Sequence, residues 1–196
     1  MVTLLTTNFN KEEVVMFSVH SLIRLLAVSG FFVASAAQAT SECGQTAQLI
    51  NTRLSYMKDV AGDKAANHLP VEDIAQEEKV IDKTLAEAAS LGLDTASIKP
   101  FMVAQINAAK AIQYRYRADW LSQPEPHWQP KSLETVRTDI GELSSKILKQ
   151  IADELKTCEK TTIADKNVFT KTIRQHNLQA ADVDIIFSTF TQIKLK

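Results

Sequence analysis

Two cations eleven residues apart, Arg53 and Lys64, lie where an amphipathic helix would place its apolar face. An α-helix turns about 100° per residue, so eleven residues return almost to the starting azimuth. Met57, Val60 and Ala61 stand between them on the same stripe, at the spacing that normally faces a core. A cation buried without an anionic partner is costly. The stripe therefore indicates one of two arrangements: both side chains extend to water, or a negatively charged group lies between them.

Three more polar side chains lie on or beside apolar helical stripes. Gln113 shares a face with Ile106 and Ala109, and Lys110 flanks that face. Arg137 lies one turn into another predicted helix. Each residue alone is more often a solvent-exposed side chain than a ligand. Taken with the first two cations, however, Gln113 and Arg137 could converge on a small dianion.

The sequence lacks the usual machinery of hydrolytic and metal-dependent enzymes. Its four histidines are scattered without HExxH spacing, and there is no CxxC pair. Neither GxSxG nor a glycine-rich phosphate loop is present. The acidic pairs Glu72-Asp73 and Glu77-Glu78 are more typical of solvated helix faces than of acid/base dyads. We therefore expect neither a metal nor a cofactor.

The first 39 residues are typical of a secretory signal region. The segment LIRLLAVSGFFVASAAQA has a basic start, an apolar centre and a small-residue end at Ala37-Gln38-Ala39. Its apolar run is short for a membrane span, so we expect cleavage after Ala39 and no stable membrane association afterwards. The residues before Met16 are unusual for a signal, which makes Met16 a candidate true start. The prediction is a periplasmic or secreted protein, and the alternative is an uncleaved anchor.

The 157 residues after Ala39 are expected to form one domain, with a net charge of −1. That charge argues against a nucleic-acid surface. Export would place the only two cysteines, Cys43 and Cys158, in an oxidising compartment, where we expect them to form a disulfide. Such a long closed loop would stabilise the fold by about 3–5 kcal/mol. The alternative is a pair of inert thiols.

The mature part of the chain is predicted to be an all-α bundle. Glycine and proline are scarce, at five each, and no segment alternates at period two for long enough to predict a strand. The pattern predicts long helices and two shorter ones near the C-terminus. Their expected ranges are about 42–68, 70–91, 95–122 and 132–155, then 164–175 and 179–192.

With these residues, the chain resembles the exported, gamma-type members of the AroQ class of chorismate mutases. The similarity covers about residues 47–196 and is strongest in RLSYMKDVAGDKAANHLPVED and AIQYRYRADW. The spacing of Arg53, Lys64 and Asp73, followed forty residues on by Gln113, is specific to it. The resemblance implies a multi-helix all-α bundle with three long helices plus shorter C-terminal helices, and a homodimer. It also implies conversion of chorismate to prephenate by an intramolecular Claisen rearrangement, which needs no nucleophile, metal or cofactor.

The resemblance assigns a role to each of four catalytic candidates. Arg53 and Arg137 would bind the substrate's two carboxylates, with Arg137 supplied by the same chain, so that each protomer holds a complete site. Lys64 would reach the ether oxygen and a neighbouring carboxylate. Gln113 would donate its amide N–H to the same ether oxygen. These tasks amount to catalysis by orientation and by preorganised electrostatics.

Four further positions would contact the substrate or line its site. Asp73 and Glu77 lie where the family contacts the hydroxyl end. Gln76 stands where some relatives carry an arginine, and an amide cannot neutralise a carboxylate. Ala109 stands where a hydroxyl residue is common and can only form part of the wall. Gln113 replaces a glutamate of some relatives, and it donates a hydrogen bond at any pH.

One function of a different class remains open. An exported, non-enzymatic helical protein, such as a chaperone or a sensor that holds a small anion, would share the composition and the helical pattern. It would have no need for Arg53, Lys64, Gln113 and Arg137 together at this spacing.

Overall fold

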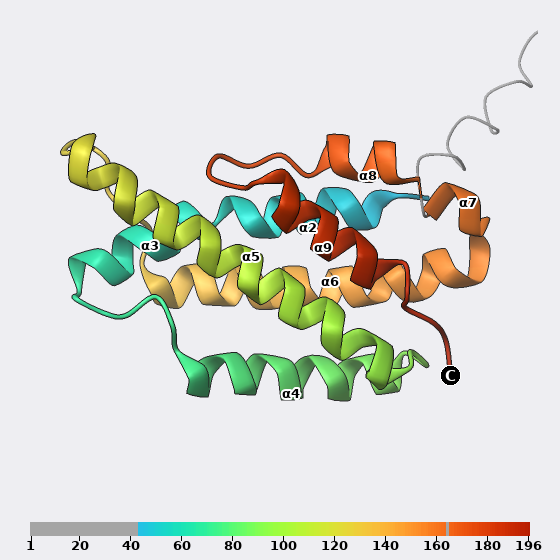
Figure 1. The fold of residues 1–196 in the computed structure, drawn as a ribbon. Coiled ribbons are helices and arrows are strands. Elements are labelled where there is room, and N and C mark those ends of the chain that lie inside the picture. Colours follow the sequence, from blue (N-terminus) through green and yellow to red (C-terminus); the bar gives the residue numbers. More distant parts are fainter. Residues whose placement is uncertain (1–42, 164) are drawn as a thin grey trace, which may run out of the picture. The chain divides into compact units, whose positions relative to one another are not determined.

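The described part of the protein is built from helices (Figure 1). The computed structural model describes residues 43–163 and 165–196, so the predicted signal region, Met16 and the cleavage point lie outside the described residues. Within these ranges the only β-type pairing is an isolated antiparallel bridge between Leu93 and Leu195. The all-α prediction is therefore confirmed. No described helix is long and apolar enough to cross a membrane.

The helices follow one another in the order α2 (Gln45–Ser55), α3 (Met57–Ala66), α4 (Ile74–Ser90), α5 (Thr95–Ser122), α6 (Leu133–Thr157), α7 (Lys160–Ile163), α8 (Lys166–Thr172) and α9 (Ala180–Phe190). Side chains of three residues cap α4, α5 and α6 by accepting a backbone N–H of the first turn: Asp73, Asp94 and Ser132. The predicted start of the fourth helix at the Ser132 cap and the predicted range 95–122 are both confirmed.

The predicted helix 42–68 is wrong in one respect, because it is two helices separated at Tyr56. The Ser55 hydroxyl donates to the carbonyl of Thr52, which is the carbonyl that the Tyr56 N–H would bond in a continuous helix. Hydroxyl side chains that bond nearby carbonyls compete with helical hydrogen bonds in this way. The break lies between Arg53 and Lys64, and it puts the two cations on different helices.

Other boundaries also differ from the prediction. The second helix begins at Ile74 rather than near Pro70, because Asp73 is its N-cap and residues 67–73 form a loop. The segment predicted as one helix near 164–175 contains α8 only, and α7 precedes it at Lys160–Ile163. The last helix, α9, is shorter at both ends than the predicted range 179–192.

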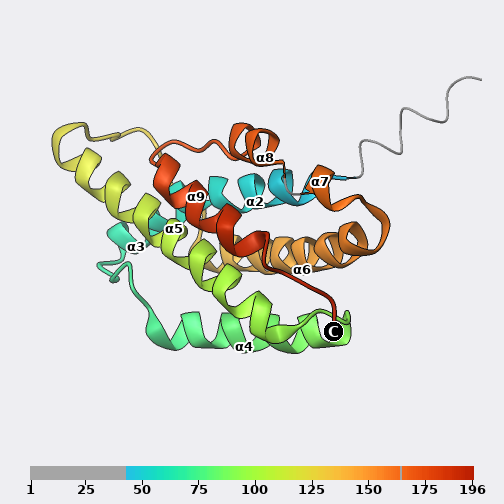
Figure 2. The same ribbon diagram turned by 45° about the vertical axis from the view of Figure 1, so that its right-hand side comes forward.

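The long helix α5 is the centre of the described bundle. It packs against α3, α4 and α9, while α6 packs against α2, α3 and α4 on another side, as the two views in Figures 1 and 2 show. Apolar side chains from these helices form one buried cluster, with Ile50, Leu54, Phe101, Ile112 and Ile151 among its fully buried members. Four helices, α3 to α6, are thereby held around a common region.

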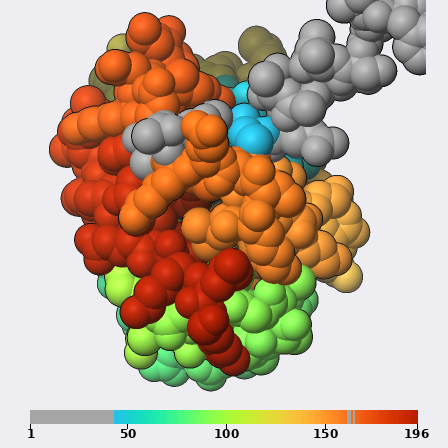
Figure 3. All heavy atoms as spheres, turned by 90° about the vertical axis from the view of Figure 1, so that its right-hand side faces the viewer, coloured from blue at the N-terminus to red at the C-terminus, as the bar shows by residue number. Residues whose placement is uncertain are grey.

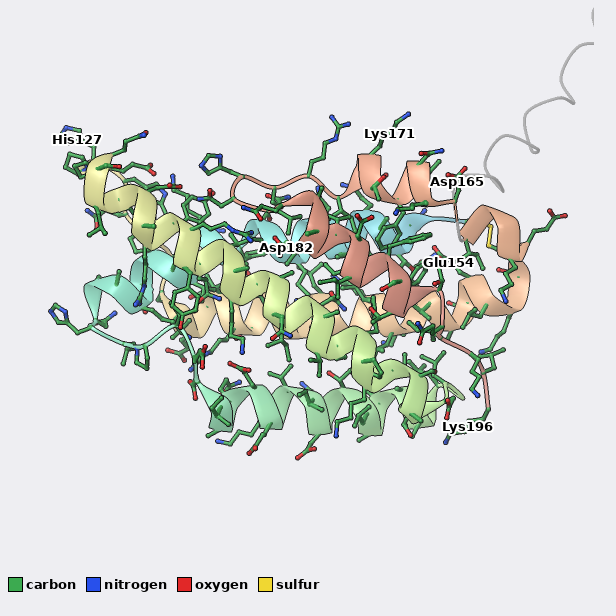
Figure 4. The ribbon with its side chains drawn as sticks, in the orientation of Figure 1. His127, Glu154, Asp165, Lys171, Asp182 and Lys196 are labelled. Carbon is green, nitrogen blue, oxygen red and sulfur yellow. A yellow bond between two sulfur atoms is a disulfide. The ribbon has the colours of Figure 1, made fainter. Side chains whose placement is uncertain are left out.

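At one end of the bundle a disulfide joins the start of α2 to the end of α6. Cys43 and Cys158 are bonded, with their Cα atoms 5.9 Å apart, as predicted. Beside them the buried carboxylate of Glu154 accepts hydrogen bonds from the backbone N–H groups of Gly44 and Thr46 and from the Thr46 hydroxyl. Figure 3 faces this end, and Figure 4 labels Glu154 and draws the disulfide in yellow. Glu154 thus caps α2, whose own N-cap residue, Gly44, has no side chain to do so.

Candidate active site

A pocket lies where α2, α3, α4, α5 and α6 approach one another. It encloses about 610 Å³ of unoccupied space, its open mouth included. The lining residues are Arg53, Met57, Val60, Lys64, Val71, Asp73, Gln76, Glu77, Val80, Ile106, Ala109, Lys110, Leu133, Arg137 and Ile140. Seven of the eight residues expected from the sequence at a substrate site are in this set, and Gln113 is the exception.

Arg53 and Lys64 both turn into the pocket rather than outward to water. Their exposed fractions are only 4% and 6%. Met57 and Val60, which lie between them on the sequence stripe, line the pocket as well. The structure excludes the first arrangement that the stripe indicated, in which both side chains extend to water.

The guanidinium of Arg53 is buried without a carboxylate. Its Nε donates a hydrogen bond to Ser144 Oγ at 3.3 Å. Its Nη1 is buried and has no hydrogen-bond partner among the described residues. Burial lowers the pKa of Arg53 to about 10, because a low-dielectric surround disfavours the charged form. An anion in the pocket would supply the acceptor that Nη1 lacks.

The ammonium of Lys64 is held by a backbone carbonyl. Nζ donates to the oxygen of Val71 at 2.6 Å, which leaves two of its three N–H groups for other acceptors. Burial is the largest influence on Lys64 and lowers its pKa. The nearby cations Arg137 and Arg117 also lower this pKa, whereas the carboxylates of Asp73 and Glu77 raise it.

The mouth of the pocket carries an ion pair with two functions. Arg137 Nη2 lies 3.0 Å from Asp73 Oδ2, and each side chain is 41% exposed. The other carboxylate oxygen of Asp73 accepts from the backbone N–H of Gln76 and so caps α4. Asp73 therefore fixes the start of α4 with one oxygen and holds Arg137 over the pocket with the other.

A second ion pair lies on the pocket wall. Glu77 Oε2 is 3.0 Å from Lys110 Nζ, and Glu77 Oε1 accepts from the backbone N–H of Asp73 at 3.4 Å. Lys110 was not expected as a site residue. The signal that could have identified it is its spacing from Ile106, one turn earlier on the same face of α5.

The charges around the pocket do not cancel. Four cations line it (Arg53, Lys64, Lys110 and Arg137) against two carboxylates (Asp73 and Glu77), which leaves a formal charge of +2. The surplus belongs to Arg53 and Lys64, because Lys110 and Arg137 are the two cations with carboxylate partners. The pocket is thus electrostatically matched to a small dianion with apolar parts.

Comparisons with known proteins agree with this chemistry. The family model described as chorismate mutase type II matches residues 44–114. A secreted chorismate mutase of Yersinia pestis is 69% identical over 173 residues, which are 88% of this chain and 92% of that protein. The chain belongs to the chorismate mutase family. A monofunctional chorismate mutase of Enterobacter agglomerans is 36% identical over 151 residues, which are 77% of this chain and 83% of that protein.

A solved structure extends the similarity to the fold. The crystal structure of the secreted chorismate mutase from Yersinia pestis matches with a TM-score of 0.77 and 73% identity, covering 79% of this chain and 99% of that chain. The present protein is therefore a chorismate mutase, an isomerase, with the all-α AroQ fold that the sequence predicts.

In this chorismate mutase the Gln113 amide lies behind the pocket wall. It is 5% exposed, and its Nε2 donates to the carbonyl of Ala109 at 3.1 Å. The same Nε2 lies 3.7 Å from Met57 Sδ, and Oε1 is buried without a partner among the described residues. Met57 and Ala109 are both lining residues. Gln113 is thus separated from the pocket by these two residues.

Sequence reasoning missed two other contacts. The acceptor for Lys64 is the carbonyl of Val71, and a backbone group of a loop leaves no trace in the sequence. The acceptor for Arg53 is Ser144, which itself donates to the carbonyl of Ile140 one turn earlier. Ser144 follows Ile140 on the apolar stripe of α6, so its spacing is a signal for this position.

Proposed function

We propose that this pocket binds chorismate as a dianion and converts it to prephenate within one molecule. The ether C–O bond breaks as a new C–C bond forms, and no proton, electron or second reactant is exchanged. The observation that carries the proposal is the pair of buried cations, Arg53 and Lys64, that face one pocket without carboxylate partners in the described chain. A substrate with two carboxylates matches the formal charge of +2.

The two arginines act as clamps for the carboxylates. Arg53 offers an unpartnered Nη1 deep in the pocket, whereas Arg137 offers its guanidinium at the mouth and is already held there by Asp73. Binding a flexible substrate at both ends selects the compact conformer in which the reacting carbons meet. Both clamps come from one chain, so each protomer holds a complete site.

Lys64 and Gln113 act on the breaking ether. The ammonium of Lys64 has two N–H groups beyond its bond to Val71, one for the ether oxygen and one for a neighbouring carboxylate. Negative charge builds up on this oxygen in the transition state, so fixed donors stabilise the transition state more than the substrate.

Gln113 has a second N–H beyond its bond to Ala109. That hydrogen is directed towards the Met57 sulfur, a weak acceptor at the pocket wall. A substrate ether oxygen beside Met57 would be the stronger acceptor, and a small rotation of the amide would reach it.

The remaining residues position the rest of the substrate. Asp73 and Glu77 would accept from the substrate hydroxyl, and both carboxylates are held in place by cations and backbone N–H groups. Gln76 would donate to an oxygen of the substrate without neutralising it. Ala109 would leave space in the wall beside the ether.

The assay that tests the proposal follows the loss of chorismate absorbance on addition of purified residues 40–196. The expected result is turnover in the wild type and strong loss in Lys64→Ala. Chorismate binding without turnover in the wild type would instead favour the non-enzymatic anion-binding protein. Full activity in Lys64→Ala would contradict the assigned site.

We further propose that the protein is exported and acts in the periplasm or outside the cell. The relative from Yersinia pestis is named a secreted enzyme, and residues 22–39 have the pattern of a cleavable signal. Expression of the full chain in a Gram-negative host, followed by mass measurement of the exported product, should give a protein that begins at Thr40.

The exported protein is also proposed to be a homodimer. Light scattering of the same product should give the mass of a homodimer.

A further inference from the structure

The loop between α3 and α4, residues 67–73, is held by two cations from different helices that donate to its carbonyls. Lys64 Nζ bonds the oxygen of Val71 at 2.6 Å, and Arg117 Nη2 bonds the oxygen of Leu69 at 2.6 Å. The loop includes His68 at φ +55°, a left-handed conformation that a residue with a side chain rarely adopts. Such a backbone needs restraint from its surroundings to persist.

The carbonyl of Val71 matters because it sets the direction of the Lys64 ammonium. A lysine side chain has four rotatable bonds and no preferred fork geometry. Fixing one of its N–H groups on a backbone oxygen restricts where the other two point. Val71 is buried at 3% exposure and lines the pocket, so its carbonyl is part of the wall beside Lys64. A shift of this loop would therefore re-aim the ammonium.

Arg117 is placed to prevent such a shift. It lies on α5 one turn beyond Gln113, and α5 packs against both α3 and α4. It also lines an open hollow together with Lys64, Leu69, Pro70 and Trp120. Arg117 is absent from the lining of the substrate pocket. Its bond to Leu69 therefore links a rigid long helix to the loop without contact with the substrate.

We propose that Arg117 is a positioning residue: by holding the carbonyl of Leu69 it fixes the α3–α4 loop so that Val71 aims the Lys64 ammonium into the substrate pocket. This inference rests on the proposed function, because it gives Lys64 its direction for that reaction. Small displacements of a catalytic group are costly, and about 1 Å can reduce the rate by about 10²-fold.

Two variants separate a positional role from a purely electrostatic one. Arg117→Met removes both the charge and the hydrogen bond, whereas Arg117→Lys keeps the charge and loses the planar fork and its reach. We expect both variants to lose about tenfold or more in kcat, with a smaller change in KM. In Arg117→Met alone, the alkaline limb of kcat should move to higher pH, since a cation that lowers the pKa of Lys64 is gone.

The matched control is Arg115→Met. Arg115 lies on the same helix but pairs with Asp182 of α9, which Figure 4 labels, and also donates to the carbonyl of Asn177. The Arg115→Met variant should have lower thermal stability than the wild type and an unchanged kcat. Wild-type kcat in Arg117→Met, or restoration of wild-type kcat in Arg117→Lys, would overturn the inference.

Hydrogen exchange gives a readout that does not depend on activity. Amides of residues 67–73 should exchange faster in both Arg117 variants than in the wild type and in Arg115→Met. Unchanged exchange in that peptide would also overturn the inference. If the wild type failed to convert chorismate, the proposed function would fail by itself, and faster exchange would still show that Arg117 holds the loop.

Discussion

Arg53 and Lys64 line one pocket from two different helices, and neither forms an ion pair with a carboxylate in the described part of the chain. Burying an unpaired cation is unfavourable for the folded state. The benefit appears only when an anion enters, because the donors are then already in place and little reorganisation is needed. The pocket thus combines a stability cost with a preorganised electrostatic field.

Removing either cation should abolish most of the activity. Arg53→Ala and Lys64→Ala are each expected to reduce kcat/KM by about 10²–10³-fold, or about 3–4 kcal/mol of transition-state stabilisation, as for the loss of an oxyanion donor. The chorismate absorbance assay measures this. Lys58→Ala is the control on α3, because Lys58 pairs with Glu125 and does not line the pocket. A loss of less than threefold in both site variants would contradict the assignment.

The same cations should make the protein less stable than it could be. Replacing Arg53 with the similarly long, uncharged Met should raise the free energy of unfolding without substrate by about 1–3 kcal/mol, while activity falls. Burial lowers the pKa of Arg53 from its ordinary value to about 10 in the folded state. Above that pH the unfolded chain binds more protons than the folded chain, so the wild type should gain stability as the pH rises through about 10.

Urea denaturation of the wild type and of Arg53→Met at neutral pH measures this difference. The penalty is fully present there, because neutral pH lies below the lowered pKa. If Arg53→Met were inactive but markedly less stable than the wild type, the prediction would be wrong. Contacts within the protein would then already compensate for the burial of Arg53.

The proposed role of Gln113 as a hydrogen-bond donor predicts that activity does not depend on the protonation of this residue. A glutamine donates at any pH, whereas a glutamate must be protonated to donate. Wild-type kcat should therefore not fall between about pH 5 and 8 through loss of this hydrogen bond. Gln113→Glu should lose activity as the pH rises through the pKa of the new carboxyl group. A steep loss in that window in the wild type that is absent in Gln113→Glu would refute the role.

The sequence predicts the helices because they depend on periodic patterns, whereas the pocket positions Asp73, Gln76, Glu77 and Ala109 were expected from the resemblance to the AroQ chorismate mutases. The spacing of Arg53 and Lys64 on an apolar stripe indicates a shared direction, and the capping residue Ser132 marks a helix start. The break at Tyr56 was missed because it has no periodic signature. It coincides with a local hydrogen bond from the Ser55 hydroxyl to the carbonyl of Thr52.

The hydrogen bonds of the α3–α4 loop and of the Gln113 amide could not be predicted from the sequence for a related reason. The bond from Lys64 to Val71 depends on the path of residues 67–73, which the predicted helix start near Pro70 did not provide. The Gln113 amide can donate either to a carbonyl of its own helix or to an acceptor in the pocket. In the structure it donates to the carbonyl of Ala109. Spacing places such a residue on a face but does not fix its side-chain rotamer.

Lys110 should influence substrate binding through Glu77. Lys110→Met removes the partner of a pocket carboxylate and lowers the formal pocket charge, so the dianion meets an unneutralised Glu77. We expect KM to rise by about threefold to tenfold, or about 1 kcal/mol, with a smaller effect on kcat. Lys99→Met on the exposed face of the same helix is the control. An unchanged KM at low ionic strength would contradict this role.

The disulfide should support stability without contributing to the reaction. Cys43 and Cys158 are 115 residues apart, and neither lines the pocket. Reduction, or the double change Cys43→Ser with Cys158→Ser, should lower the free energy of unfolding by about 3–5 kcal/mol in the chain-entropy model. Glu154→Gln should add a further loss, because Glu154 caps α2 at the same end. At temperatures where circular dichroism shows the reduced protein to be folded, kcat/KM should equal that of the oxidised protein. A lower kcat/KM in that folded, reduced state would mean that the disulfide also orders the pocket.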